Sequence, residues 1–238
     1  MPAPIQPGDP EQVRDLFDQI APAYDRLNDA LSLGLHRLWK RQAIAWVQPR
    51  PGQRLLDLCC GTGDLALVLA EKVRPAGLVL GLDAAAVPLQ QARRRAARQP
   101  WLPLDFRQGD ALATHLPDGW ADGAVMAYGL RNLADPEAGL LELRRVLKPG
   151  ARAAVLDFNR PAQDDSLTAT FQRFYLRQLV VPLARRAGME AQYAYLEDSL
   201  ARFPVGPEQE AMALRVGFAQ ARHRLLAGGQ MGVLQLLA

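Results

Sequence analysis

The stretch Leu55–Ala66 constrains the fold of this chain more than any other part of the sequence. Its apolar start predicts a short buried strand, Gly61 and Gly63 predict a tight turn, and the apolar spacing after the turn predicts a helix. A second apolar run, Leu78–Leu82, leads directly into Asp83. A strand, a glycine turn, a helix and a second strand with a terminal carboxylate form the first half of a nucleoside-binding α/β sheet.

This unit fits two classes of cofactor site. Gly61–Ala66 matches the G-x-G-x-x-G/A pattern of dinucleotide-binding sheets. Asp57 instead fits the acidic residue that opens the glycine loop of S-adenosylmethionine-dependent methyltransferases, with Cys59 where the first glycine usually stands. A pyrophosphate favours a helix N-terminus with positive potential, and Asp57 and Asp64 would repel it. We therefore predict a methyltransferase loop, with a nicotinamide-dependent reductase or a glycine turn without a ligand as the alternatives.

Strands and helices alternate after this unit. Strands are expected near 54–58, 78–82, 104–107, 122–127 and 152–157, and helices near 63–73, 86–98, 136–147 and 207–217. This alternation predicts an α/β fold with a doubly wound, mainly parallel sheet and helices on both faces. Two further strands, 218–226 and 230–237, are joined by Ala227-Gly228-Gly229. They complete a seven-stranded sheet with the antiparallel edge that methyltransferases have.

The domain organisation follows from the remaining segments. We expect a disordered tail at 1–10, a single methyltransferase domain at 11–238, N-terminal lid helices at 11–50 with breaks near Pro22 and Gly34, and a helical insert at 165–203. These last two segments would form a lid over the cofactor site.

Composition restricts the classes of function. The net charge of +3 and the pI of about 9.1 are weak grounds for a nucleic-acid partner, which we do not expect. The only two cysteines, Cys59 and Cys60, are adjacent and too few for a metal site, so no metal is expected. Because no membrane-spanning run and no secretory pattern are visible, a cytoplasmic location is expected.

Polar residues also follow the third and fourth strands. Asp110 comes after the third strand, where a carboxylate can accept a hydrogen bond from an adenine amine. Arg131 and Asn132 come after the fourth. An arginine there can stabilise a developing oxyanion or position a water, or can simply pair with a carboxylate such as Asp135. Three histidines, His36, His115 and His223, are expected to be structural or solvated, with His36 an outside candidate for a catalytic base.

Several of these motifs together resemble a known family, the quinone C-methyltransferases of ubiquinone and menaquinone biosynthesis. The resemblance runs from about Phe17 to Leu234 and rests on Phe17–Asn28, Ser32 with Gly34, Trp39, the Asp57–Asp64 loop, Gly129-Leu130-Arg131-Asn132 and Arg145–Gly150. The C-terminal part is similar to the cyanobacterial and plastid branch, through Tyr193-Ala194-Tyr195-Leu196, Arg202-Phe203-Pro204 and Gly228–Leu234.

The resemblance implies roles for individual residues. The expected contacts with S-adenosyl-L-methionine are Asp57, Gly61, Thr62, Gly63, Asp83, Asp110 and Ala111. The expected substrate contacts are Tyr24, Asn28 and Asn132. Arg131 aligns with an arginine proposed to assist deprotonation of the ring, and is the expected catalytic residue. Ala127 departs from the family pattern, because several relatives have at this position a serine that touches the cofactor.

The implied reaction is C-methylation of a prenylated naphthoquinol, the demethylphylloquinol of phylloquinone synthesis. Demethylmenaquinol and a ubiquinone-precursor benzoquinol remain alternatives, as does a non-catalytic assembly subunit that keeps the fold. Because a phytyl tail is insoluble in water, we expect a peripheral membrane contact. Leu167–Met189, with aromatic residues at helical spacing and several arginines, is expected either to make that contact or to pack as a lid. The sequence gives no oligomeric state.

Overall fold

The structure is a computed structural model that describes residues 5–32, 34–162 and 190–238, with residues 21–31 and 190–194 described by their backbone alone. The side chains of Tyr24 and Asn28 therefore lie outside the description. So does the whole of Leu167–Met189, and its predicted role at a membrane or as a lid stays a prediction.

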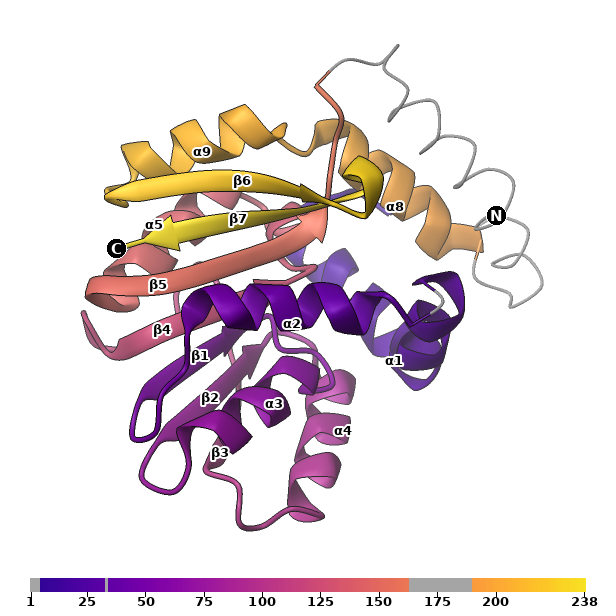
Figure 1. The fold of residues 1–238 in the computed structure, drawn as a ribbon. Coiled ribbons are helices and arrows are strands. Elements are labelled where there is room, and N and C mark those ends of the chain that lie inside the picture. The colour runs from indigo at the N-terminus through magenta and orange to yellow at the C-terminus, as the bar shows by residue number, and fades with distance from the viewer. Residues whose placement is uncertain (1–4, 33, 163–189) are drawn as a thin grey trace.

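A seven-stranded sheet forms the centre of the molecule, in the order β3-β2-β1-β4-β5-β7-β6 (Figure 1). The strands are β1 (Arg54–Leu58), β2 (Leu78–Asp83), β3 (Leu104–Gln108), β4 (Ala121–Ala127), β5 (Leu147–Phe158), β6 (Gln220–Leu226) and β7 (Met231–Leu237). The first five are parallel, and β7 runs antiparallel to both β5 and β6. The predicted doubly wound, mainly parallel sheet with an antiparallel edge is confirmed.

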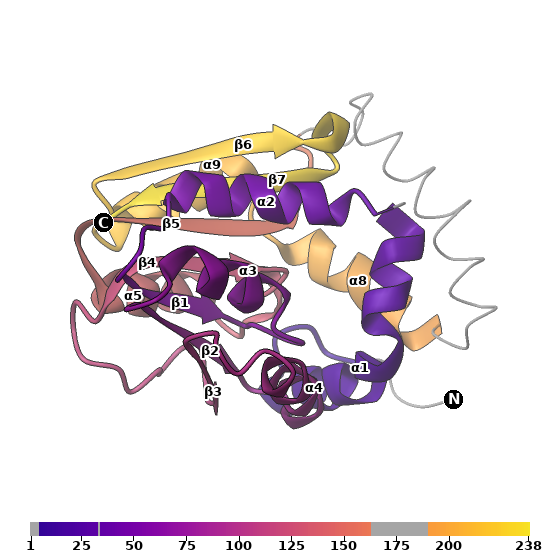
Figure 2. The same ribbon diagram turned by 60° about the horizontal axis from the view of Figure 1, so that its bottom comes forward.

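Helices cover both faces of the sheet. They are α1 (Pro10–Ser32), α2 (His36–Val47), α3 (Asp64–Val73), α4 (Ala86–Ala97), α5 (Pro136–Val146), α8 (Glu190–Arg202) and α9 (Gly206–Arg215), with short 3₁₀ helices η1 (Leu130–Asn132) and η3 (Ala227–Gly229). Figures 1 and 2 show α2, α3 and α4 on one face and α5 and α9 on the other.

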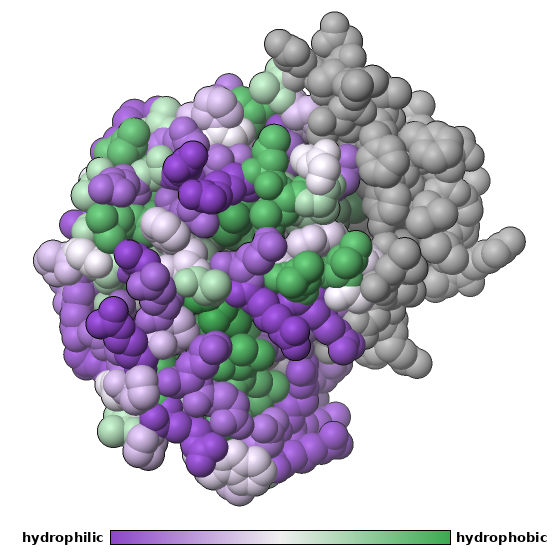
Figure 3. All heavy atoms as spheres, in the orientation of Figure 1, coloured by the Kyte–Doolittle hydropathy of each residue, from purple (hydrophilic) through white to green (hydrophobic). Residues whose placement is uncertain are grey.

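Two apolar cores follow from this layering. Leu55 of β1 packs with Ile44 and Leu69 on the α2–α3 side, whereas Leu56 packs with Leu140 on the α5 side. Successive residues of a strand point to opposite faces, so a sheet covered on both sides needs an almost continuous apolar sequence. The outer surface is mixed: Figure 3 shows small apolar groups between polar side chains on the face that carries α2.

The strand order reverses between β1 and β4, which are adjacent although two strands separate them in the sequence. From β1 the chain winds outward to β2 and β3, and it then crosses back to β4. The loops at the carboxyl ends of β1 and β4 therefore diverge, and the crevice between them is where open α/β sheets bind ligands.

The N-terminal helices differ from the prediction at one point. The predicted break near Pro22 is wrong, because α1 continues through it from Pro10 to Ser32. A proline inside a helix removes one hydrogen bond and bends the helix, but good helix formers on either side can carry it on. Figure 2 shows that α1 changes direction along its length. The predicted break near Gly34 is present: its φ of +77° separates α1 from α2.

The two helices also differ in what they cover. Side chains of α2, among them Ala43, Ile44 and Val47, are buried against the sheet. α1 instead packs on α4, and the start of α1 is capped by Asp9, whose carboxylate accepts from the N–H groups of Glu11 and Gln12, both at 3.0 Å.

In the described part of the chain no helix is long and apolar enough to span a membrane, and no cluster of three or more metal-ligating side chains is found.

Candidate active site

The loop between β1 and α3 has the backbone of a glycine loop. Gly61 and Gly63 have φ values of +54° and +82°, which glycine adopts without strain. A Cβ on Gly63 would come within 2.9 Å of the Phe106 ring, whereas a Cβ on Gly61 would meet nothing within 4 Å. Gly61 therefore leaves the backbone open to a ligand. Cys59 has a φ of +58°, which explains why a glycine is usual at its position.

Asp57 lies beneath this loop and is almost fully buried. Its Oδ2 accepts a hydrogen bond of 2.8 Å from the N–H of Ala66 in α3, but its Oδ1 is buried and has no hydrogen-bond partner among the described residues. Burial raises the pKa of this carboxyl to about 8, and the nearby Lys40 offsets only part of that effect. An unpaired buried oxygen is costly, so this position favours a ligand that supplies a donor or a positive charge.

Asp83 joins the end of β2 to the glycine loop. Its Oδ2 accepts from the N–H of Gly61 at 2.7 Å, and its Oδ1 accepts from the N–H of Ala85 at 2.9 Å. Burial raises the pKa of Asp83. Each oxygen keeps a second lone pair, so the carboxylate can still accept from a ligand hydroxyl.

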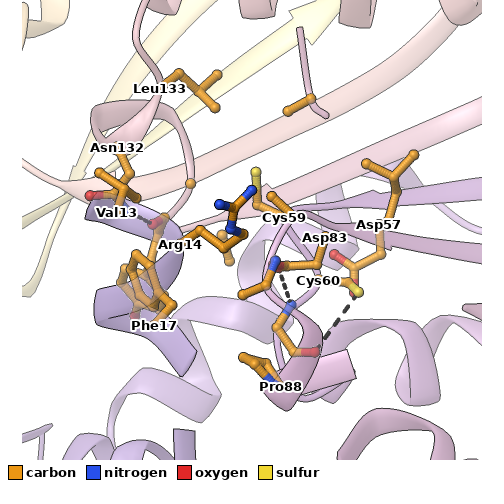
Figure 4. A pocket seen from close by; sticks show the side chains of 18 of the residues that line it. Val13, Arg14, Phe17, Asp57, Cys59, Cys60, Asp83, Pro88, Asn132 and Leu133 are labelled. Carbon is orange, nitrogen blue, oxygen red and sulfur yellow. Dashed lines mark hydrogen bonds between the residues drawn. The ribbon is translucent and has the colours of Figure 1, made fainter. Parts of the chain in front are cut away.

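One pocket brings most of the predicted site residues together (Figure 4). The space in the pocket and the open solvent at its mouth together amount to about 1210 Å³. The predicted residues in its lining are Asp57, Gly61, Thr62, Asp83, Asp110, Ala111 and Asn132, and Ala127 lines it as well. Gly63 lies behind the loop, and Arg131 is absent from the described lining.

Asp110 and Thr62 contribute differently to this lining. Asp110 is exposed, and its Oδ1 accepts from the N–H of Leu112 at 2.9 Å, so Oδ2 remains for a ligand. Thr62 is buried, and its Oγ1 and carbonyl oxygen accept from Arg95 at 3.2 and 3.0 Å. Asp64, at the start of α3, pairs with Lys40 at 3.0 Å and with Arg95 at 2.5 Å. Although burial acts in the opposite direction, these cations lower the pKa of Asp64.

Arg131 lies on η1 and is held from the side away from the pocket. Its Nη1 pairs with Asp157 at 2.9 Å, its backbone N–H donates to the same carboxylate, and its guanidinium lies 5.2 Å from the centre of the Phe158 ring. The pairing with a carboxylate that we considered is therefore made, but to buried Asp157 rather than to Asp135. The Nε of Arg131 is buried and has no hydrogen-bond partner in the described part of the chain.

Asn132 connects η1 to α8. Its Nδ2 donates to the carbonyl oxygen of Tyr128 at 2.6 Å, and its Oδ1 accepts from the hydroxyl of Tyr195 at 2.8 Å. Burial raises the pKa of Tyr195 to about 12, so its hydroxyl stays protonated and acts as a donor. These two bonds fix the orientation of an amide that lines the pocket.

Helix α1 forms the roof of the pocket through Pro10, Val13, Arg14 and Phe17, which share one face of the helix. The carboxylate of Asp18 accepts from the N–H of Val87 at 2.7 Å, which ties α1 to the start of α4. None of the three histidines belongs to the described lining of the pocket. His36 is buried and bonded to Ser32, and His223 packs between Gly206 and Gly232.

Comparison with known proteins agrees with this geometry. The family model described as the ubiE/COQ5 methyltransferase family matches residues 6–235. The chain belongs to this family. It is 50% identical over 224 residues to a 2-phytyl-1,4-naphtoquinone methyltransferase of Trichormus variabilis, covering 94% of this chain and 97% of that protein. It is 43% identical over 222 residues to the chloroplastic 2-phytyl-1,4-beta-naphthoquinone methyltransferase of Arabidopsis thaliana, covering 92% and 84%.

Solved structures support the fold of this family. A methyltransferase from Thermotoga maritima superposes with a TM-score of 0.62 at 18% identity, covering 94% of this chain and 98% of that one. One from Aquifex aeolicus gives 0.58 at 17% identity, covering 83% and 88%. This chain is thus an S-adenosylmethionine-dependent methyltransferase of class I fold. The alternative function considered from the sequence, a nicotinamide-dependent reductase, is therefore rejected.

The sequence did not point to every residue of the ubiE/COQ5 site. Val13, Arg14 and Lys40 line the pocket but belong to helices whose placement over the loop depends on tertiary packing. Tyr195 stood in the quoted C-terminal resemblance, yet nothing in its spacing paired it with Asn132. The sequence predicted the N-terminal helices as a lid over the cofactor site, but no local pattern identified which of their side chains line the pocket.

Proposed function

We propose that this methyltransferase adds a methyl group to a ring carbon of a prenylated naphthoquinol, converting demethylphylloquinol to phylloquinol. The observation that carries the proposal is identity of 50% and 43% to two enzymes named for 2-phytyl-1,4-naphthoquinone, over more than nine-tenths of this chain. Demethylmenaquinol or a ubiquinone-precursor benzoquinol is the second candidate, because the family covers both pathways.

The pocket residues fit S-adenosylmethionine. The unpaired buried Oδ1 of Asp57 suits an ammonium group, and the strand-end carboxylate of Asp83 suits the hydroxyls of a ribose. Asp110 and Ala111 would hold the adenine. Gly61 and Thr62 of the loop would lie against the part of the cofactor that joins its amino acid group to its ribose. When bound, this group supplies an electrophilic methyl, and the protein residues hold and orient it.

Helix η1 carries Arg131 and Asn132, the two residues expected to act on the substrate. A ring carbon of the quinol becomes nucleophilic when a ring hydroxyl loses its proton, and the oxygen then carries negative charge. Donors fixed beforehand stabilise such a charge because they need no reorganisation. We assign this role to Arg131 acting through a water, because Asp157 holds its guanidinium outside the described pocket lining, and we assign positioning of the ring to Asn132. Tyr24 and Asn28 remain predicted substrate contacts.

The test is methyl transfer to a panel of reduced substrates: demethylphylloquinol, demethylmenaquinol and a demethylated benzoquinol. Purified protein and labelled S-adenosylmethionine are incubated with each, and kcat/KM is compared. We expect the phytyl naphthoquinol to be preferred. A preference for the benzoquinol would move the assignment to the ubiquinone pathway, and transfer to none of them would favour an assembly role.

We further propose that the protein acts in the cytoplasm as a peripheral protein at a membrane surface. Leu35 and Leu38 are 49% and 50% exposed at the junction of α1 and α2, close to the exposed side chains of Arg37 and Arg41. Apolar side chains beside arginines are suited to an anionic lipid surface. Co-sedimentation with anionic vesicles should fall in the double variant Leu35→Ser, Leu38→Ser, whereas Leu225→Ser, at an exposed position on β6, should leave it unchanged.

A further inference from the structure

Arg14 is a pocket residue of α1 that has no role in the reaction as proposed above. It lies on α1 and lines the pocket, and in the view of Figure 4 its side chain is between those of Phe17 and Cys59. A guanidinium stays charged at any pH that a protein tolerates. A partly buried cation in an apolar-roofed pocket normally has an anionic partner.

Each of the four carboxylates in the described lining accepts a hydrogen bond or forms an ion pair with a group other than Arg14. Asp83 accepts from two backbone N–H groups, Asp64 pairs with Lys40, and Asp110 accepts from Leu112. Asp57 accepts from α3. Within the described part of the chain, no ion pair or hydrogen bond joins the Arg14 guanidinium to any of them.

The neighbour on the same helix is also engaged. Asp18 is one turn after Arg14, at the spacing that forms helix ion pairs. Its carboxylate instead accepts from the N–H of Val87 and anchors α1 to α4. The two cations of the described lining thus differ: Lys40 is paired with Asp64, and Arg14 has no acidic partner among the described residues.

We propose that Arg14 is the anion-binding residue of this pocket, pairing with an anionic oxygen of a bound ligand. This inference rests on the proposed function, which supplies two such oxygens: the carboxylate of the cofactor and the ionised ring oxygen of the quinol. Both are matched by the planar fork of a guanidinium, which binds a carboxylate or a single oxyanion through parallel N–H donors. The lid helix thereby brings the charge into the site.

The test is calorimetric titration of wild type, Arg14→Gln and Arg14→Lys with S-adenosylhomocysteine and with 5′-methylthioadenosine, which lacks the amino acid. If Arg14 binds the cofactor carboxylate, Arg14→Gln weakens S-adenosylhomocysteine on the order of 10- to 100-fold and leaves methylthioadenosine unchanged. Arg14→Lys should restore part of the loss. Arg94→Gln, which removes an exposed positive charge from α4 outside the pocket, is the matched control and should bind both ligands normally.

Binding of the other anionic oxygen, the ionised ring oxygen of the quinol, predicts a different outcome. If Arg14 binds the ring oxygen, both titrations stay unchanged, kcat/KM for the reduced quinol falls at least tenfold, and the pH at which that profile rises moves upward. Affinity and kcat/KM both within twofold of wild type would overturn the proposal. A melting temperature measured alongside separates misfolding from lost binding. Failure of the proposed function is distinct, because wild type itself would then neither bind S-adenosylhomocysteine nor methylate a quinol.

Discussion

Asp57 gives the sharpest prediction, because its environment couples cofactor binding to a proton. With a pKa of about 8, its carboxyl is about nine-tenths protonated in the cofactor-free protein at pH 7. An ammonium placed at the unpaired Oδ1 favours the ionised form. Binding of S-adenosylhomocysteine at pH 7 should therefore release close to one proton, about 0.9 at most, from this carboxyl.

The assay is calorimetry in two buffers of different ionisation enthalpy, such as phosphate and Tris. The difference between the apparent binding enthalpies gives the number of protons released. In Asp57→Asn this release should vanish, and affinity should fall about 10- to 100-fold with the loss of a charge-assisted hydrogen bond. Asp110→Asn removes the same charge from an exposed position of the lining and should keep the release. Wild type that releases no proton, or a variant that releases as many, would refute the reasoning.

The same shift makes a prediction about stability. The folded protein holds the Asp57 proton more tightly than the unfolded chain, whose reference pKa is 3.8. Its contribution to stability is therefore fully present below about pH 4 and is lost as the pH rises toward 8, on the order of 5 kcal/mol across that window. Asp57→Asn should lack this loss. Denaturant unfolding of both proteins at pH 5 and pH 8, without cofactor, measures the part of this loss between those two pH values, on the order of 4 kcal/mol.

Three further predictions concern the rest of the site. Asp83→Ala should weaken S-adenosylhomocysteine by about 1–3 kcal/mol, because it leaves the N–H of Gly61 and ligand hydroxyls unpaired, and calorimetry showing unchanged affinity would count against the ribose assignment. Arg131→Lys should lower kcat while cofactor affinity stays nearly intact, since lysine keeps the charge but loses the planar fork; loss of cofactor binding would place Arg131 in the cofactor site instead. Tyr195→Phe should raise KM for the quinol several-fold and leave S-adenosylhomocysteine binding unchanged, because it frees the Asn132 amide to rotate; an unaltered KM would make this hydrogen bond purely structural.

The fold could be predicted from the sequence wherever the local preference of a segment matches the structure that tertiary packing requires of it. The apolar run before Asp57 and the glycines after it determine strand, turn and helix together, and Asp135 followed by Pro136 caps the next helix as such residues usually do. Pro22 shows the limit of this reasoning. Its local preference against helix is real, but α1 extends on both sides of it, so the proline does not end the helix.

The site was less open to prediction than the fold, because it depends on contacts between distant segments. Residues at the ends of neighbouring strands, such as Asp83 and Asp110, could be placed together because parallel strands share a carboxyl edge. Arg131 follows β4 in the same way, yet Asp157, at the end of the adjacent strand, holds its guanidinium away from the pocket lining. Arg14 and Tyr195 reach the site from helices whose docking no local pattern specifies.

The proposed reaction is methylation of a ring carbon of a reduced naphthoquinol in this pocket. The most direct measurement uses S-adenosylmethionine with a deuterated methyl group and 2-phytyl-1,4-naphthoquinone, with and without dithionite, followed by mass spectrometry of the product. We expect the label on a ring carbon, and only when the reductant is present, because a quinone ring is electron-poor and has no hydroxyl proton to lose. Label on a ring oxygen, or equal transfer to the oxidised quinone, would contradict it.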